Sequence, residues 1–419
     1  MLRMVETFSG IGAQSKALRN ANIEHEILNT ADWDINAIIA YDLIHSKNID
    51  NSKYSNLTKD ELLKLLDGKT LSLDGKKAAT REMIEKLNIN VLIHLCGAID
   101  RTKNLISVTD IKGEDLPNDM NILTYSFPCQ DLSVAGFWHG NKGGIDRDAN
   151  NRSSMLWQIE RMLLERKKQD LPMPRFLLME NVRNITSHQH VANFNSWKKS
   201  LEDMGYKNIV LKLDSSYFGI PQKRVRIYMI SILSNNDREI NDAINEYFAN
   251  HDLQNVNYVC NLNIRKTNIE DILKIDYTKE KYKKEADFSQ PNDTKSRRDI
   301  YNSNCHLFDG KIIKQEYIST LTTKQDRHPN SGVIDYDNGK DGKSKFRYIT
   351  PREGFMFMGF SEDDYEVIVN NNFQKRGESE FFTRDKLNKM AGNSIVVNVL
   401  EEIFKQIEYI NNYMFVNNE

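Results

Sequence analysis

The chain has 419 residues, of which 39% are hydrophobic and 28% charged, a balance typical of a globular protein with one large domain or two smaller ones. Its net charge of −2 excludes an overall basic protein, so any nucleic-acid ligand has to meet Lys and Arg gathered on one face. No apolar run approaches the ~18 residues of a membrane span, and the N-terminus has no apolar signal region, so we expect a cytoplasmic protein that makes no membrane contact.

The four cysteines are far apart in the sequence. None of them forms a CxxC pair, so we expect neither a disulfide framework nor a bound metal, and a reducing compartment. They are Cys96, Cys129, Cys260 and Cys305.

The first 45 residues predict two strand–helix units. A short strand at Met4–Phe8 is broken by Ser-Gly-Ile-Gly and followed by a helix at Ala13–Asn20. A second strand at Glu26–Ala31 precedes a helix at Ile35–Ile44.

The alternation of strands and helices continues to about residue 232. Apolar segments predict three more strands, at Asn121–Tyr125, Arg175–Met179 and Val225–Ile232, with helices at Met155–Lys167 and Phe194–Met204 between them. Strands that alternate with helices indicate an α/β fold with a mostly parallel sheet covered on both faces.

Two stretches interrupt this pattern. Lys47–Arg101 is polar and Lys-rich, with helical runs at Lys59–Leu66 and Lys77–Leu87, and resembles an insertion. Ser234–Phe346 loses the alternation and predicts a smaller irregular domain, after which Asn398–Tyr413 predicts an amphipathic helix. We therefore expect one domain from residues 1–233 and 383–419, with a helical insertion at 47–105, and a second from residues 234–382.

A glycine turn, Phe8-Ser-Gly-Ile-Gly12, lies between the first strand and its helix. Small residues there let a ligand approach the backbone near a helix N-terminus, although the third glycine of the dinucleotide fingerprint is missing and a purely structural turn is the alternative. Asp32, about 20 residues on at a strand end, can bind ribose hydroxyls, and Trp33 can cover a flat ring or belong to the core.

Polar side chains also follow later strands. Cys129 in Ser-Phe-Pro-Cys-Gln comes just after a strand, where a thiolate is a strong nucleophile; a buried structural cysteine is the alternative. Glu180 ends the next strand, where a carboxyl with a raised pKa can exchange a proton with a nitrogen heterocycle. A solvent-facing carboxylate that caps a helix is the alternative. Arg224 and Arg226 are two apart, so an extended chain places both on one face, toward a base oxygen or a phosphate; surface ion pairs are the alternative.

Taken in order, FSGIG, DW, SFPCQ, ENV, QKRVR and a late AGNS resemble the motifs of the DNA (cytosine-5) methyltransferases. The resemblance covers roughly residues 4–47, 106–232 and 318–405, and FPCQDLS and MENV are its most specific parts. Prokaryotic CpG-type members are similar through GIGAQ, LTYSFPCQDLS and LLMENV, and they share the helical insertion. The resemblance implies a Rossmann-like S-adenosylmethionine-dependent methyltransferase domain with a smaller target-recognition domain.

The resemblance also assigns catalytic roles. Cys129 adds to C6 of a cytosine flipped from double-stranded DNA, so that C5 can take a methyl group from S-adenosyl-L-methionine, leaving S-adenosyl-L-homocysteine. Glu180 holds N3 and the amino edge, Arg226 contacts O2 with support from Arg224, and water removes the C5 proton. Pro128 shapes the turn that carries Cys129, and Gln130, the next residue of the same motif, is also assigned to the catalytic group.

For the cofactor, the resemblance implies a methionine-binding turn, ribose and adenine contacts, and a late segment that returns to the site. Asp32 replaces the commoner Glu, and Met155 stands where the family usually has Leu. The implied cofactor residues are Phe8, Gly10, Ile11, Gly12, Asp32, Trp33, Asp110, Ile111, Ser126, Pro128, Met155, Asn393 and Ser394.

For DNA, the resemblance implies a mobile loop at Leu132–Ser154, with Ser133 and Arg152 as DNA contacts. We expect target choice to reside in Lys295–Ser331, whose basic stretch TKQDRHPNSG departs from the CpG-type relatives and favours a site of about four or more base pairs. The expected contacts there are Arg297, Arg298, Thr320, Thr322, Lys324 and Arg327.

Two alternatives remain at this point. A tRNA cytosine-5 methyltransferase carries the same motifs but usually a shorter second domain, and a catalytically dead DNA-binding protein would not need Cys129, Glu180 and Arg226 intact. We expect a monomer, prokaryotic or phage, that acts within a restriction-modification system. Its recognition sequence and any cognate restriction endonuclease are not deducible from the sequence.

Overall fold

A six-stranded sheet forms the centre of the computed structural model, which describes the chain except for residues 129–131, 133–143, 147–152, 326–328, 377–378 and 417–419. The strand order is β2-β1-β3-β4-β7-β5. The strands are β1 Leu2–Thr7, β2 His25–Ala31, β3 Ile122–Tyr125, β4 Phe176–Val182, β5 Tyr206–Asp214 and β7 Val225–Leu233.

The sheet is mostly parallel, as expected from the sequence. β1 pairs in parallel with β2 and β3, and β3 with β4, whereas β7 runs antiparallel to both β4 and β5. The edge strand β5 was not predicted, because most of its residues are only half-buried and its apolar alternation is interrupted by lysines.

Each face of the sheet has its own hydrophobic core. Side chains alternate along each strand, so Met4 and Leu178 belong to one core, and Val5 and Met179 to the other. The first core packs against α1 Ala13–Asn20, α2 Ile35–His45 and α18 Val397–Ile410, and the second against α8 Leu156–Lys168 and α9 Val191–Asp203.

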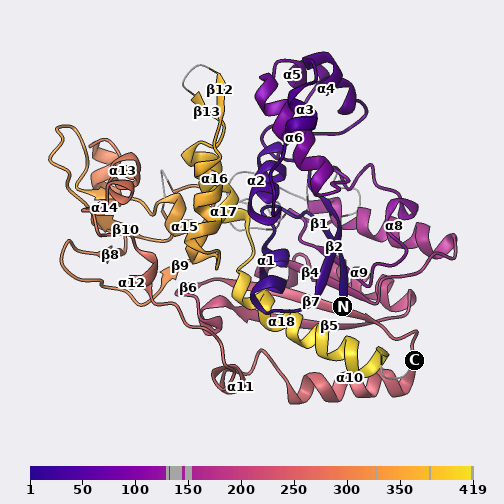
Figure 1. The fold of residues 1–419 in the computed structure, drawn as a ribbon. Helices are drawn as coiled ribbons and strands as arrows, with labels where there is room; N and C mark the ends of the chain where they lie inside the picture. Colours follow the sequence, from indigo (N-terminus) through magenta and orange to yellow (C-terminus); the bar gives the residue numbers. More distant parts are fainter. Residues whose placement is uncertain (129–131, 133–143, 147–152, 326–328, 377–378, 417–419) are drawn as a thin grey trace.

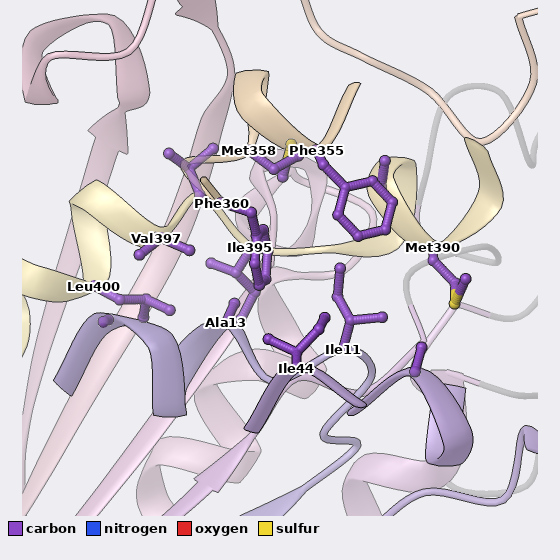
Figure 2. Packing of buried hydrophobic residues seen from close by; sticks show 14 of the residues in the cluster. Ile11, Ala13, Ile44, Phe355, Met358, Phe360, Met390, Ile395, Val397 and Leu400 are labelled. Atoms are coloured by element: carbon purple, nitrogen blue, oxygen red, sulfur yellow. The ribbon is translucent and has the colours of Figure 1, made fainter. Parts of the chain in front are cut away.

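The last helix returns to the beginning of the chain. α18 packs along α1, and Figure 2 shows Leu400, with Val397 next to it, beside Ala13 at the start of α1. Ten of the 14 residues of α18 are buried, while Lys405 and Tyr409 are exposed, which agrees with the amphipathic helix expected near residues 398–413. The sheet domain is therefore completed by residues from both ends of the chain.

Four described α-helices lie between α2 and β3: α3 Ser52–Ser55, α4 Lys59–Leu65, α5 Arg81–Glu85 and α6 Ile89–Arg101. α6 was not predicted, although it is the longest of the four, and it packs against α2. Arg101 at its end forms an ion pair of 2.6 Å with buried Asp42 of α2. This segment is therefore firmly joined to the sheet domain.

The helices from α10 to α17 follow β7 in the chain (Figure 1). They are α10 Arg238–Asn250, α11 Val256–Cys260, α12 Ile269–Ile272, α13 Glu280–Ser289, α14 Lys295–Ser303, α15 Pro351–Phe357, α16 Glu362–Asn370 and α17 Arg384–Asn393. Short strands accompany them: β6 Gln222–Lys223, β8 His306–Phe308, β9 Ile318–Ser319, β10 Val333–Asp335, β11 Phe346–Arg347, β12 Gln374–Arg376 and β13 Ser379–Glu380. Single turns occur at η1 Gly113–Asp115, η2 Ser153–Met155, η3 Arg183–Thr186, η4 Ser215–Phe218 and η5 Asn411–Val416.

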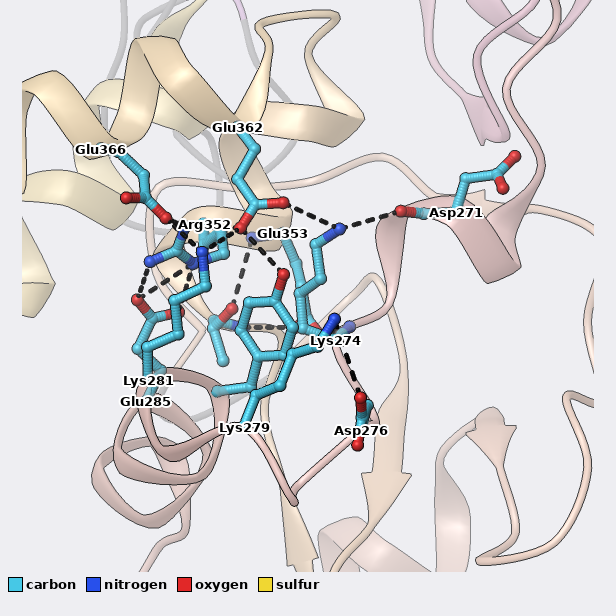
Figure 3. A network of polar contacts seen from close by, with 12 residues as sticks. Asp271, Lys274, Asp276, Lys279, Lys281, Glu285, Arg352, Glu353, Glu362 and Glu366 are labelled. Carbon is cyan, nitrogen blue, oxygen red and sulfur yellow. Dashed lines mark hydrogen bonds and ion pairs between the residues drawn. The ribbon is translucent and has the colours of Figure 1, made fainter.

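Charged side chains hold this irregular part together (Figure 3). Arg352 of α15 reaches Glu285 at 2.8 Å and also pairs with Glu362 and Glu366 of α16. Arg347 and Glu353 are both fully buried and form two 2.8 Å hydrogen bonds. Such paired charges supply order where short elements offer little apolar core. Among the described residues, no helix is long and apolar enough to cross a membrane.

Candidate active site

The glycine turn after β1 faces open space. Phe8 and Gly10 have φ angles of 53° and 54°, in the left-handed region. A Cβ at Gly10 would meet no atom within 4 Å, whereas one at Gly12 would lie 2.1 Å from Nε2 of His45. Gly12 is thus required by packing, while Gly10 leaves its backbone accessible to a ligand.

Beneath this turn, Glu6 of β1 is fully buried. Its Oε2 accepts hydrogen bonds from Ser15 Oγ at 2.8 Å and Tyr41 Oη at 2.9 Å. Burial raises the pKa of Glu6 to about 7, and these hydrogen bonds only partly oppose the shift. Sequence reasoning missed Glu6, which was read only as part of a strand.

Asp32 closes the turn from the end of β2. Its carboxylate accepts from the Gly10 amide at 2.9 Å and from the Asp34 amide at 2.8 Å. Burial and, to a smaller extent, the charge of Asp34 raise the pKa of Asp32 to about 6, although the hydrogen bonds from the Asp34 and Gly10 amides oppose the shift. Trp33 is half-buried against the core. Turn, carboxylate and ring therefore meet at one edge of the sheet, the carboxyl end of parallel strands.

Asn104 connects Asp32 to the segment that carries Asp110 and Ile111. Its Oδ1 accepts from the Asp32 amide at 3.3 Å and from the Ile106 amide at 2.7 Å. Arg161 of α8 donates to the Ile111 carbonyl at 2.7 Å, which holds that segment against the sheet. Asp110 is exposed and Ile111 buried. Asn104 carried no motif signal in the sequence.

The turn after β3 is anchored on both sides. Cys129 and Gln130 lie outside the described residues, but Asn181 Nδ2 donates to the Phe127 carbonyl at 3.0 Å and Asn184 Nδ2 to the Leu132 carbonyl at 2.7 Å. Ser153 Oγ donates to the Pro128 carbonyl at 2.8 Å. Asn181 at the end of β4 and Asn184 of η3 therefore hold Phe127 and Leu132, the described residues on either side of positions 129–131. Ser126, directly after β3, is half-buried.

Glu180 and Arg226 form an ion pair beside this turn. Glu180 Oε1 lies 3.3 Å from Arg226 Nε, and the two side chains are 12% and 14% exposed. The antiparallel register sets Val182 opposite Arg226, so Glu180, two residues before Val182, shares the face of Arg226. Burial raises the pKa of Glu180, and the charges of Arg226 and Arg224 oppose the shift.

Arg224 has backbone partners that the sequence did not indicate. It lies between β6 and β7, where the chain is not one continuous strand, and its guanidinium is buried. Nη1 donates to the Leu321 carbonyl at 2.8 Å, and Nη2 to the carbonyls of Gly392 and Ser394 at 3.0 Å each. Arg224 therefore joins the Thr-Leu-Thr turn to the late AGNS segment.

Gly392 makes this junction possible. A Cβ there would lie 2.5 Å from the carbonyl carbon of Thr322 and from the amide nitrogen of Thr323. Asn393 is exposed and Ser394 nearly buried. Gln222, also missed from sequence, bridges the same region: its Oε1 accepts from the Leu321 amide at 2.8 Å and its Nε2 donates to the Phe357 carbonyl at 2.8 Å.

The expected DNA contacts are dispersed. Arg298 pairs with Asp293 at 2.8 Å, while the guanidinium of Arg297 lies 5.8 Å from the Tyr348 ring centre. Thr320 Oγ1 donates to the Lys223 carbonyl, and Thr322 Oγ1 to the Lys324 carbonyl. Ser133, Arg152 and Arg327 lie outside the described residues, and Met155 is half-buried at the start of α8.

Comparison with known sequences gives consistent matches. The family described as C-5 cytosine-specific DNA methylase matches residues 66–409. The type II methyltransferase M2.ScrFI of Lactococcus lactis subsp. cremoris is 33% identical over 97% of this chain and 99% of its own length. The orphan methyltransferase M.SssI of Spiroplasma monobiae is 31% identical over 97% of both chains.

Solved structures share the fold at low identity. The S. pombe Dnmt2 methyltransferase aligns over 99% of this chain and 100% of its own, with a TM-score of 0.59 and 19% identity. The Entamoeba histolytica methyltransferase EhMeth covers 98% of both chains with a TM-score of 0.55 and 13% identity.

Proposed function

The chain belongs to the C-5 cytosine-specific DNA methylase family, and we propose that it flips a cytosine out of duplex DNA and methylates C5 within a short specific site. The observation that carries this proposal is the buried pair of Glu180 and Arg226 beside the turn that holds Cys129. Flipping is required because C5 and C6 of a stacked cytosine are out of reach of a protein thiol.

The pair is suited to the edge of a flipped cytosine. Because its pKa is raised, the Glu180 carboxyl can carry a proton and donate it in a hydrogen bond to N3 of the base. The Arg226 guanidinium then binds O2, where negative charge develops during addition. The two residues hold each other in place before the base arrives, so little reorganisation is needed.

Cys129 is proposed as the nucleophile. Its sulfur would form a bond to C6 as the C5–C6 double-bond electrons move to C5. C5 would then take the methyl group as the methyl–sulfur bond of bound S-adenosyl-L-methionine breaks, leaving S-adenosyl-L-homocysteine. Water would take the C5 proton, and those electrons would restore the double bond as the C6–S bond breaks. Asn181 and Asn184 fix the two sides of its turn, and Pro128, whose carbonyl accepts from Ser153, shapes it.

The cofactor site fits S-adenosyl-L-methionine. The open side of Gly10 accepts a ligand close to the backbone, and the Asp32 carboxylate lies where ribose hydroxyls are expected in such folds. Trp33 and the segment of Asp110 and Ile111 flank the place for adenine, held by Asn104. When bound, the cofactor supplies the methyl group.

We further propose that Lys295–Ser331 selects the target and that the site is longer than CpG. Residues 1–233 and 383–419 form the catalytic part, and residues 234–382 the recognition part. The setting is a restriction-modification system of a prokaryotic cell or phage, in which the protein acts as a cytoplasmic monomer on double-stranded DNA.

Covalent trapping tests the proposed reaction. Duplex DNA that contains 5-fluorocytosine should remain attached to the wild type and to Cys260→Ala, an exposed cysteine elsewhere, because fluorine does not leave as a proton. Cys129→Ala should bind DNA and cofactor without trapping. Trapping by Cys129→Ala would show that the nucleophile is wrong, and methylation of tRNA but not of duplex DNA would overturn the substrate.

Bisulfite sequencing of DNA from cells that express the protein tests the recognition proposal. A context of about four or more base pairs is expected, and Arg297→Ala should relax the preference at one position, whereas Lys283→Ala, an exposed cation on α13, should leave it unchanged. Uniform methylation of every CpG would refute the longer site. Unchanged preference in Arg297→Ala and Arg327→Ala would refute the assignment to Lys295–Ser331.

A further inference from the structure

A cavity of about 220 Å³ lies where the helical insertion meets α17 and the turn after β9. Four cations line it: Lys76 of the insertion, Lys324 after the Thr-Leu-Thr turn, and Arg384 and Lys389 of α17. They come from three parts of the chain that are far apart in sequence, so the fold gathers this charge in a protein whose net charge is −2.

The loop Ser72–Lys77 that carries Lys76 is fixed to the cofactor side of the sheet. The Ser72 amide donates to the Trp33 carbonyl at 2.8 Å, and the Ile35 amide donates to the Ser72 carbonyl at 3.0 Å. Ser72 is fully buried, and its Oγ donates to the Lys77 carbonyl at 2.6 Å. Lys76 therefore projects from a rigid support rather than from a free surface loop.

α17 fixes the same loop from the other side. Lys389 Nζ lies 2.8 Å from Asp34 Oδ2 and also donates to the Asp74 carbonyl. Gly75 has a φ of 64°, and a Cβ there would lie 2.5 Å from Asp34 Oδ2 and 2.8 Å from Lys389 Nζ. The glycine allows this close approach, so the position of Lys76 relative to α17 is set by packing.

The cations differ in how far their charge is compensated. Lys389 is neutralised by Asp34, and Arg384 lies 3.5 Å from Asp385 and over the ring of Phe288. Among the described residues, no carboxylate pairs with the ammonium of Lys76 or Lys324, and both side chains are exposed. Two ammonium groups that no described carboxylate neutralises favour an anion in this cavity.

We propose that the loop Ser72–Lys77 is a DNA-backbone-binding element of the insertion, in which Lys76 and Lys324 contact one phosphodiester near the target site. The inference rests on the proposed function, because duplex DNA must enter between the catalytic and recognition parts. Lys324 belongs to Lys295–Ser331, the segment proposed to contact DNA. Because Lys76 of the insertion lines the same cavity as Lys324, a phosphate bound by Lys324 would also contact the insertion. This contact fixes register rather than reading sequence.

The salt dependence of binding tests the contact. The dissociation constant for a duplex that carries the mapped site is measured between about 50 and 200 mM salt. Loss of one phosphate contact in Lys76→Ala should reduce the slope of log K against log salt by about 0.9. It should also weaken binding at low salt by about tenfold. Lys76→Arg should keep the slope, and Lys64→Ala, an exposed cation of the insertion away from the cavity, should match the wild type.

Neutral methylphosphonate linkages then locate the phosphate. At one position the substitution should weaken the wild type, yet add little to the loss in Lys76→Ala, because the two changes remove the same contact. A wild-type slope in Lys76→Ala, or additive losses at every position, would overturn the inference. A wild type that binds and methylates no DNA would instead overturn the proposed function.

Discussion

Replacement of Arg224 by methionine should destabilise the protein rather than disable one step of the reaction. The guanidinium donates to three backbone carbonyls, of Leu321, Gly392 and Ser394, and so connects the Thr-Leu-Thr turn to the end of α17. Methionine fills much of the same volume but donates no hydrogen bond, so the three carbonyls lose this donor.

The expected loss is about 3 kcal/mol. Each buried carbonyl left without its partner costs ~1–3 kcal/mol, and we take the lower end for each because a junction between two parts of the chain admits water more easily than a closed core. Arg224→Lys should lose about 2 kcal/mol, since one ammonium cannot reach three carbonyls that a planar guanidinium serves together.

Urea denaturation, followed alongside kcat and the DNA dissociation constant, measures the effect. The midpoint should fall in Arg224→Met, and DNA binding should weaken because the Thr-Leu-Thr turn is released. Lys223→Met, the exposed neighbour, should stay within about 0.5 kcal/mol of the wild type. An unchanged midpoint with a reduced kcat would refute this reasoning, because it would mean that Arg224 acts on the base directly.

Three further outcomes follow from other parts of the site. Burial raises the pKa of Glu6 from 4.5 to about 7, so wild-type stability should fall as pH rises through that window; urea denaturation should show Glu6→Gln more stable at pH 8, by on the order of 3 kcal/mol, and equal at pH 4. Equal stabilities at pH 8 would contradict the raised pKa of Glu6. Gly392→Ala should cost about 1–3 kcal/mol in the same assay, because the new methyl group meets the backbone of Thr322; no change would mean that the junction is loose. Asn181→Ala removes the hydrogen bond to the Phe127 carbonyl and should lower kcat about tenfold or more with cofactor affinity retained, whereas an unaltered kcat would show that the turn of Cys129 is held by other contacts.

Much of the sheet domain could be predicted because its signals are local. The strands β1, β2, β3, β4 and β7 are short apolar runs bounded by breakers, and these are visible in the sequence. β5 and α6 were missed for different reasons. β5 is a half-exposed edge strand stabilised by pairing with distant β7, and α6 follows a polar stretch that led the whole segment to be taken as an insertion.

The candidate site was predictable in its motif residues but not in its supports. Glu180 and Arg226 occur in recognisable motifs at strand ends, and the structure brings them together. Asn104, Gln222 and the real contacts of Arg224 act through backbone carbonyls and amides contributed by remote segments. Spacing along one strand says nothing about such partners, so the three carbonyls that Arg224 contacts could not be predicted from its distance to Arg226.

The packing of α18 on α1 has a consequence for synthesis on the ribosome. α1 ends at residue 20 and α18 ends at residue 410. At a synthesis rate of ~5–20 residues per second, α18 is therefore completed about 20–80 s after α1. Until then the apolar surface that will receive Val397, Leu400 and Phe404 is exposed on the nascent chain, where chaperones can bind it. A chain released early by a premature stop codon before residue 390 would lack both α18 and the AGNS segment. Truncated products should therefore be aggregation-prone and inactive.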